Sequence, residues 1–348
     1  MVNLSRRIGI CISDGFSDMT EDKIVKLLID KGLGSARLPI LQVSGGFLHR
    51  MYKVDTETGS YAVKHLNPNI MQRPSAMGNF KRAEALESVL ESAGIPIVPA
   101  LTIGGSKMQN VEGDCFYIYQ WQNGTVTDKY NITADQCRIA GNIQGRIHAV
   151  APRSIPKPEP ELSCIDWAGL IDEAESKDFE LWKLLKENEK LFFYAESEMN
   201  KARAALPGIE CIVDEDMDPK NVMWDDGAPK VIDLECLERG NPVSSTLQLS
   251  LQWAGASICD LDFTKLKAYF DGYFEAYDNG FRDYGSVFGL AYTWIEWLEY
   301  NIKRALGHCA DEAEREMGLS QVEQTAEIIR YLRKTEDRII WNFKRWFE

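Results

Sequence analysis

The chain has 348 residues, 45% of them hydrophobic, and a formal net charge of −14. This length is sufficient for two lobes with separate cores. There is no long apolar run, no secretory leader and no C-x-x-C pair among the eight cysteines, so we expect a cytoplasmic protein without membrane contact or structural zinc. All of the acidic excess follows residue 124, which argues against a nucleic-acid partner and favours a cationic small molecule.

The first 124 residues predict a small lobe rich in strands. Residues 1–19 look irregular, and Thr20 could cap a helix that ends at Gly32 and Gly34. Two strands at residues 42–44 and 51–54 would then flank a glycine tip, Gly45 and Gly46, and a third strand over residues 61–64 carries Lys64. Glycines let a backbone approach phosphates closely, and a lysine on a strand supplies a point charge for them.

The next segments predict a helix over residues 79–92 and a strand over residues 116–119. The helix carries Glu84, Glu87 and Glu91 away from its apolar side, and one of them could pair with Lys64. The lobe would end near Asn123 and Gly124.

Residues 125–348 predict a larger and mostly helical lobe. Its expected helices are separated by a Pro-rich loop at 151–160 and a hairpin, and they cover residues 133–150, 176–205, 244–257, 262–277, 283–306 and 319–347. In the helix at 283–306, Trp294, Trp297 and Leu298 have helical spacing and are interpreted as core. The alternative is that they form an aromatic and acidic wall suited to a cation.

The hairpin carries the most informative motif of the chain. Asp216 and Asn221 lie five residues apart, and Asp233 follows twelve residues later at the end of an apolar run. The strand from Asn221, the turn at 225–227 and the return strand at 230–234 would bring Asp233 back beside Asn221. Phosphoryl transfer needs such a set: one carboxylate orients and deprotonates a hydroxyl, while an amide oxygen and a second carboxylate hold Mg²⁺.

With these parts in this order, the chain resembles the aminoglycoside phosphotransferase and choline kinase family of small-molecule kinases. The resemblance rests on the segment from Asp214 to Asn221, which matches the family motif His-Gly-Asp-Leu-His-Pro-Gly-Asn, and it covers residues from about 20 to 346. It implies an α+β, protein-kinase-like bilobal fold, with a β-rich lobe over 1–124 and a helical lobe over 125–348.

The resemblance also assigns roles to residues. Asp216 would be the catalytic base, Asn221 and Asp233 the Mg²⁺ ligands, and Lys64 the phosphate-binding lysine. Its partner would be Glu84, with Glu87 as the alternative, and His148 would be structural. The remaining nucleotide contacts would come from Gly45 and Gly46 and from an adenine-contacting hinge of Gln120, Trp121 and Gln122. The donor would be ATP or GTP, since hinge hydrogen bonds come from the backbone.

The motif departs from the family at its first position, where Asp214 replaces His. Four carboxylates then lie within five residues, namely those of Asp214, Glu215, Asp216 and Asp218. These carboxylates raise one another's pKa values unless a cation is near. An enzyme is therefore weighed against a catalytically impaired pseudokinase that only binds nucleotide. A protein kinase is disfavoured because the chain contains no Ala-Pro-Glu, and a Walker-type ATPase because it contains no G-x4-G-K-[ST].

The expected partners are the nucleotide and a small acceptor with a hydroxyl group, such as an aminoglycoside or an amino alcohol. Candidate acceptor contacts are the carboxylates of Asp218, Glu235, Glu296 and Glu299. The sequence leaves the oligomeric state open.

Overall fold

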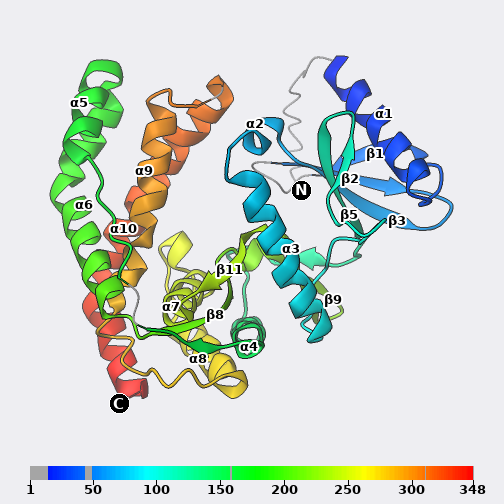
Figure 1. Cartoon of the computed structure of the whole chain (residues 1–348). Coiled ribbons are helices and arrows are strands. Elements are labelled where there is room, and N and C mark those ends of the chain that lie inside the picture. Colours follow the sequence, from blue (N-terminus) through cyan, green and yellow to red (C-terminus); the bar gives the residue numbers. More distant parts are fainter. Residues whose placement is uncertain (1–14, 44–48, 157–158, 310, 348) are drawn as a thin grey trace, which may run out of the picture. The chain divides into compact units, whose positions relative to one another are not determined.

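The computed structural model describes residues 15–43, 49–156, 159–309 and 311–347 of the chain (Figure 1). The chain divides into two compact units. The first comprises the residues up to 84 together with 98–123, and the second comprises 85–97 together with 124–348. The α+β class predicted from the sequence is confirmed, with a sheet in the N-terminal region and mostly helices in the C-terminal region.

The first unit is built on a five-stranded antiparallel sheet in the order β1-β2-β3-β5-β4. The strands are β1 (Arg37–Val43), β2 (Arg50–Asp55), β3 (Ser60–His65), β4 (Gln109–Val111) and β5 (Asp114–Gln120). Side chains alternate between the two faces of a strand, so each face has its own core.

Helix α1 (Gly15–Asp30) packs Ile24, Leu27 and Leu28 on one face, against a cluster that includes Val63 and Ile118. The opposite face holds the cluster of Leu66 and Tyr117 with Ala76 and Phe80 from the start of α3 (Ala76–Ser92), which follows the short helix α2 (Pro68–Met71).

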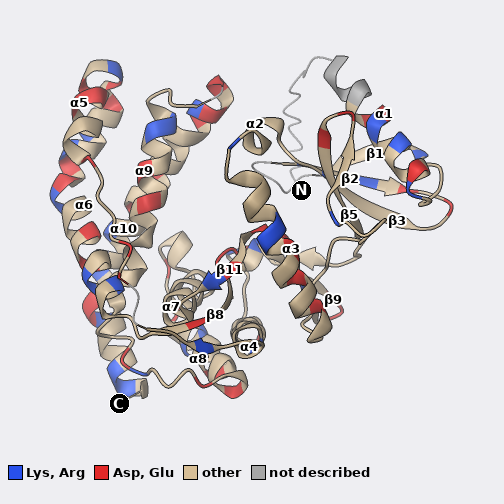
Figure 2. Cartoon of the chain, in the orientation of Figure 1, with Lys and Arg blue, Asp and Glu red and all other residues tan. Residues whose placement is uncertain are grey.

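The second unit is mostly helical and contains a large hydrophobic core. Its helices are α4 (Ala134–Ala149), α5 (Trp167–Lys177), α6 (Phe179–Ala205), α7 (Pro242–Trp253), α8 (Phe263–Ala276), α9 (Trp294–Ala305) and α10 (Glu312–Phe347). Lys and Arg alternate with Asp and Glu along the outer helices (Figure 2), where pairs such as Lys201–Glu198 follow helical spacing. No helix within the described residues is long and apolar enough to cross a membrane.

Two small antiparallel sheets carry the hairpin motif. One has the order β11-β8-β7, and the other has the order β10-β9-β6. Their strands are β6 (Thr125–Val126), β7 (Arg153–Ser154), β8 (Ile209–Asp214), β9 (Val222–Asp225), β10 (Ala228–Val231) and β11 (Leu237–Gly240). The predicted turn is confirmed, because Asp226 and Gly227 both have positive φ, as a tight hairpin turn requires.

Helices α4 and α8 cross with their backbones in direct contact. A Cβ atom added to Gly141 would lie 2.0 Å from the carbonyl oxygen of Tyr269, and one added to Gly272 would lie 1.9 Å from that of Arg138. At the end of α4, His148 is fully buried and its Nδ1 lies 2.9 Å from the hydroxyl oxygen of Tyr273. Burial lowers the pKa of His148 to about 3. Its complete burial and its contact with Tyr273 agree with the structural interpretation from the sequence.

Several predicted helix boundaries were wrong. Helix α1 begins at Gly15, so residues 15–19 are not irregular and the buried Thr20 is not its cap. The helix predicted over 176–205 is two helices, because Asp178 adopts an extended conformation and its side chain caps α6 through the Leu181 N–H at 3.1 Å. The sequence also gave no expectation for α5.

The two predicted C-terminal helices also begin elsewhere. Only residues 294–305 of the segment 283–306 are α-helical, and the 3₁₀ helix η4 (Phe288–Thr293) precedes them. There Gly289 lies against the backbone of α6, where a Cβ would meet the Glu198 carbonyl oxygen at 2.1 Å. Helix α10 begins at Glu312, seven residues early, in a charged stretch that shows little apolar periodicity.

Candidate active site

The proposed base Asp216 lies in the loop that joins β8 to β9 in the second unit. Strand β8 ends at Asp214, which pairs with Leu237 of β11. The loop then forms a single 3₁₀ turn, η1 (Pro219–Asn221), which is capped by the Asp218 side chain through the Lys220 N–H at 3.0 Å. The aspartates of the motif are therefore held by a sheet on one side and a capped turn on the other.

Neighbours hold both carboxylate oxygens of Asp216. The Asn221 side-chain amide donates to Oδ2 at 2.9 Å and to the Asp216 carbonyl oxygen at 2.8 Å, while the Lys220 ammonium donates to Oδ1 at 2.8 Å. The Asp216 side chain keeps 36% of its surface exposed. Asp216 is therefore oriented and still accessible, which a general base requires.

Lys220 is a site residue that the sequence analysis missed. Its ammonium also donates to Asp218 Oδ2 at 2.7 Å, so one cation bridges two carboxylates of the motif. These two acids raise the pKa of Lys220 against the opposing effect of its burial. The signal was present in the sequence, because Lys220 is the only cation between positions 214 and 221.

The hairpin brings the two proposed metal ligands together. Val222 pairs with Val231, and the Ile232 N–H donates to the Asn221 carbonyl oxygen at 2.9 Å, so Asp233 follows directly beside buried Asn221. Asp233 adopts a left-handed conformation with φ 60°, which is uncommon outside glycine and often marks a functional position.

These two residues fit a magnesium ion that is shared with a nucleotide. Mg²⁺ is usually held by one or two protein oxygens together with phosphates, rather than by an all-protein cage. No cluster of three or more His, Cys, Asp or Glu side chains suited to a metal occurs within the described part of the chain. One amide oxygen and one carboxylate are a suitable donor set for this arrangement.

Asp214, which stands where the family has His, is a buried scaffold residue. Its Oδ1 accepts the Asp216 N–H at 3.2 Å, and its Oδ2 has no hydrogen-bond partner among the described residues. Burial, reinforced by the charges of Asp216 and Asp233, holds the pKa of Asp214 well above its usual range.

Cations of the protein pair with Asp218, Glu296 and Glu299, which are carboxylates proposed for acceptor contacts. Asp218 pairs with Lys220, and Glu299 pairs with Lys303 at 2.7 Å. Both oxygens of Glu296 accept from Arg203 of α6 at 2.7 Å. The fourth, Glu235, lies in the 3₁₀ helix η2 (Leu234–Cys236) directly after Asp233.

The tryptophans of α9 divide between core and surface. Leu298 is fully buried and Trp294 packs against the core, as interpreted from the sequence. Trp297 is 40% exposed and stacks on Tyr300, so its interpretation as core was wrong. The helix turns Trp297 away because Leu298, the next residue, takes the buried face.

In the first unit, Lys64 lies on β3 with only 4% of its surface exposed. It is the register partner of Tyr117 on β5, so the two side chains share one face of the sheet. The Tyr117 hydroxyl donates to Glu84 Oε1 at 2.7 Å, which brings a predicted partner of Lys64 to that face. The alternative, Glu87, is also buried. The pairing of Lys64 with either glutamate remains a prediction.

The predicted hinge follows the end of β5. The Trp121 N–H and the Gln120 side-chain amide both donate to the Ser60 carbonyl oxygen at 3.0 Å, and the Gln122 side chain donates to the Gln120 carbonyl oxygen at 2.9 Å. Lys53 lies over the Trp121 ring at 4.9 Å from its centroid. The predicted glycine tip, Gly45 and Gly46, lies outside the described residues.

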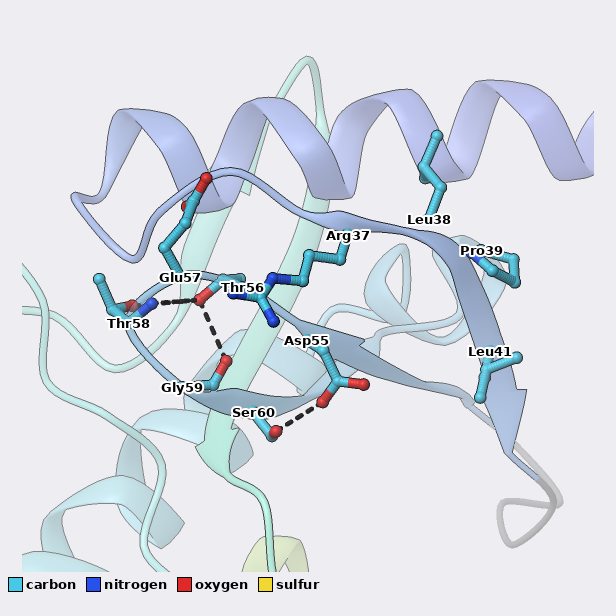
Figure 3. Close-up of a pocket in the computed structure, with 10 residues that line it drawn as sticks. All are labelled: Arg37, Leu38, Pro39, Leu41, Asp55, Thr56, Glu57, Thr58, Gly59 and Ser60. Atoms are coloured by element: carbon cyan, nitrogen blue, oxygen red, sulfur yellow. Dashed lines mark hydrogen bonds between the residues drawn. The ribbon is translucent and has the colours of Figure 1, made fainter.

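A hollow of about 580 Å³ lies elsewhere on the first unit, beside the turn between β2 and β3 (Figure 3). Its lining includes Arg37, Asp55 and Ser60, and the Ser60 hydroxyl donates to Asp55 at 2.5 Å. Among the predicted nucleotide, metal and acceptor residues that the structure describes, none lines it.

The profile of the Phosphotransferase enzyme family matches residues 39–290, which include Asp216, Asn221 and Asp233. The chain belongs to this family. The predicted recognition is therefore confirmed, and the enzyme class that follows is an ATP-dependent small-molecule kinase. A search of curated protein sequences finds no match to this phosphotransferase.

Solved structures share the fold of this phosphotransferase at low sequence identity. A spectinomycin phosphotransferase in complex with ADP and spectinomycin is 13% identical with a TM-score of 0.65, and the match covers 88% of this chain and 97% of that chain. An ethanolamine kinase from Plasmodium vivax is 13% identical with a TM-score of 0.56, over 89% and 86% of the two chains. A microcompartment-associated aminopropanol kinase is 14% identical with a TM-score of 0.57, over 90% and 98%.

Proposed function

We propose that this phosphotransferase moves the γ-phosphoryl group of ATP or GTP to a hydroxyl group of a small acceptor, with Asp216 as the base. The observation that carries the proposal is the geometry of Asp216, whose carboxylate is oriented by Asn221 and Lys220 and remains accessible. A base must lie within hydrogen-bond reach of the proton it takes, so an acceptor hydroxyl would bind against this carboxylate.

In the proposed reaction the acceptor oxygen loses its proton to Asp216 and forms a bond to the γ-phosphorus. The bond between that phosphorus and the oxygen bridging it to the β-phosphate breaks, and the nucleoside diphosphate leaves. Asn221 and Asp233 would hold Mg²⁺, which when bound neutralises charge on the phosphates. In the first unit, Lys64 and the segment from Gln120 to Gln122 would bind the nucleotide.

The acceptor class includes amino alcohols and aminoglycosides, which the acidic excess after residue 124 favours. Neutral polyols are also candidate acceptors, because Asp218, Glu296 and Glu299 are already paired with cations of the protein. A cationic acceptor would have to compete with these lysines and with Arg203.

The test is a panel of spectinomycin, ethanolamine, 1-amino-2-propanol and neutral polyols, with release of ADP and GDP measured in the presence of Mg²⁺. We expect Asp216→Asn to lose about 10²–10⁴-fold in turnover while nucleotide affinity changes little. Asp225→Asn, an exposed aspartate nine residues away in β9, is the control and should stay near the parent rate.

Two results would contradict the proposal. Near-normal turnover by Asp216→Asn would remove the base assignment. Nucleotide binding without turnover of any acceptor would favour the pseudokinase instead.

A further inference from the structure

The Lys220 ammonium donates to two carboxylates in the loop that joins β8 to β9, and the proposed reaction gives this lysine no role. It lies 2.8 Å from Asp216 Oδ1 and 2.7 Å from Asp218 Oδ2. It is the only cation in the segment 214–221, which holds four acidic residues. Removing it would leave two carboxylates facing each other across the site.

Most ion pairs of this kind contribute little, because exposed pairs are screened by water. Lys267 and Asp271 on α8 form such a pair at 2.7 Å, with the lysine side chain 45% exposed. Lys220 is equally exposed, at 48%, but it differs in its partners.

One of those partners, Asp218, is only 19% exposed and accepts from both the backbone N–H and the ammonium of Lys220. This double contact closes a small ring around η1 and fixes where the ammonium lies. The other partner is the proposed base itself.

We propose that Lys220 is a positioning residue for Asp216 and that Asp218 is its anchor. This inference rests on the proposed function. Lys220 holds one carboxylate oxygen of Asp216 while Asn221 holds the other, so rotation of the carboxylate would break both hydrogen bonds. A base held in one orientation can accept the proton of the acceptor hydroxyl while the acceptor oxygen is aligned to attack the phosphorus. A small misplacement of such a base costs on the order of 10²-fold in rate.

The experiment measures kcat and KM for MgATP in the full-length protein, with water as acceptor through phosphate release and with any acceptor found in the panel. We expect Lys220→Met to lower kcat by about 10–100-fold with little change in the KM for MgATP. Lys220→Arg should recover part of that loss, because it keeps a donor and a positive charge within reach of both acids.

The anchor is tested by a double-mutant cycle. Asp218→Asn should lower kcat in the same direction, and Lys220→Met with Asp218→Asn should lose little more than Lys220→Met alone, because the anchor acts through the lysine. Lys267→Met is the matched control and should keep the parent kcat. Melting temperatures of all variants separate lost positioning from lost folding.

The outcomes test three statements separately: the positioning role of Lys220, the anchor role of Asp218 and the proposed function. A Lys220→Met kcat within twofold of the parent would overturn the positioning role alone, and so would an equal loss in Lys267→Met. Losses that are fully additive would overturn the role of Asp218 as anchor. A parent protein without turnover of water or of any panel acceptor would overturn the proposed function, and the role of Lys220 with it.

Discussion

Gly141 lies where α4 crosses α8, and replacing it by alanine should destabilise the second unit. In an ordinary helix interior the same replacement stabilises by about 0.5–1 kcal/mol, because alanine loses less backbone entropy. Here the new Cβ would lie 2.0 Å from the Tyr269 carbonyl oxygen and 2.9 Å from its carbonyl carbon. Those atoms belong to a helix backbone and cannot turn aside, so the two helices must separate.

Overpacking of this kind typically costs about 1–3 kcal/mol. Subtracting the propensity gain leaves a net loss of about 0–2.5 kcal/mol. Because the new Cβ would lie 2.0 Å from a backbone oxygen, we expect the upper part of that range, about 1–2 kcal/mol, for Gly141→Ala. For domains of 150–250 residues, each kcal/mol corresponds to roughly 2–4 °C in melting temperature. The expected change is therefore a fall in melting temperature of a few degrees.

The assay is thermal unfolding followed by tryptophan fluorescence and calorimetry. Gly78→Ala is the control, because Gly78 also lies in a helix, α3, and its Cβ would meet only an Arg82 side-chain nitrogen at 3.5 Å. Gly78→Ala should leave stability unchanged or raise it by up to about 1 kcal/mol. A Gly141→Ala protein as stable as the parent would refute the reasoning, since it would mean that the helix crossing can open without cost.

Three further predictions concern pH and metal. The native pKa of His148 is about 3 and its unfolded value about 6.5, so this group should lower stability by about 1.4 kcal/mol per pH unit as pH falls from about 6.5 to about 3. Urea unfolding of His148→Gln should lack this contribution. The native pKa of Asp214 is raised, so without metal Asp214→Asn should gain stability over the parent as pH rises from about 4, and parallel pH curves would contradict this. Asp233→Ala should reduce the Mg²⁺ dependence of nucleotide binding in calorimetry, and a parent whose nucleotide affinity is the same with and without Mg²⁺ would exclude a metal role for Asp233.

The sequence determined those features that depend on local spacing. The turn at Asp226 and Gly227 follows from residues that accept positive φ, and the hairpin then brings Asp233 to Asn221. The order of lysine strand, glutamate helix and paired aspartates identified the family, which the profile confirms. Helix boundaries depend on more than local spacing. At η4, for example, close packing of Gly289 on α6 overrides the helical pattern of the sequence.

Only the tertiary structure decided what each charge of the site meets. Four carboxylates within five residues suggested a site in need of an external cation, yet Lys220 bridges two of them and burial holds the pKa of Asp214 well above its usual range. Likewise, Glu296 lies 93 residues from its partner Arg203, a separation that no local pattern bridges. The physical reason is that pKa values and ion pairs depend on distances in space and on burial. The order of residues along the chain does not specify either.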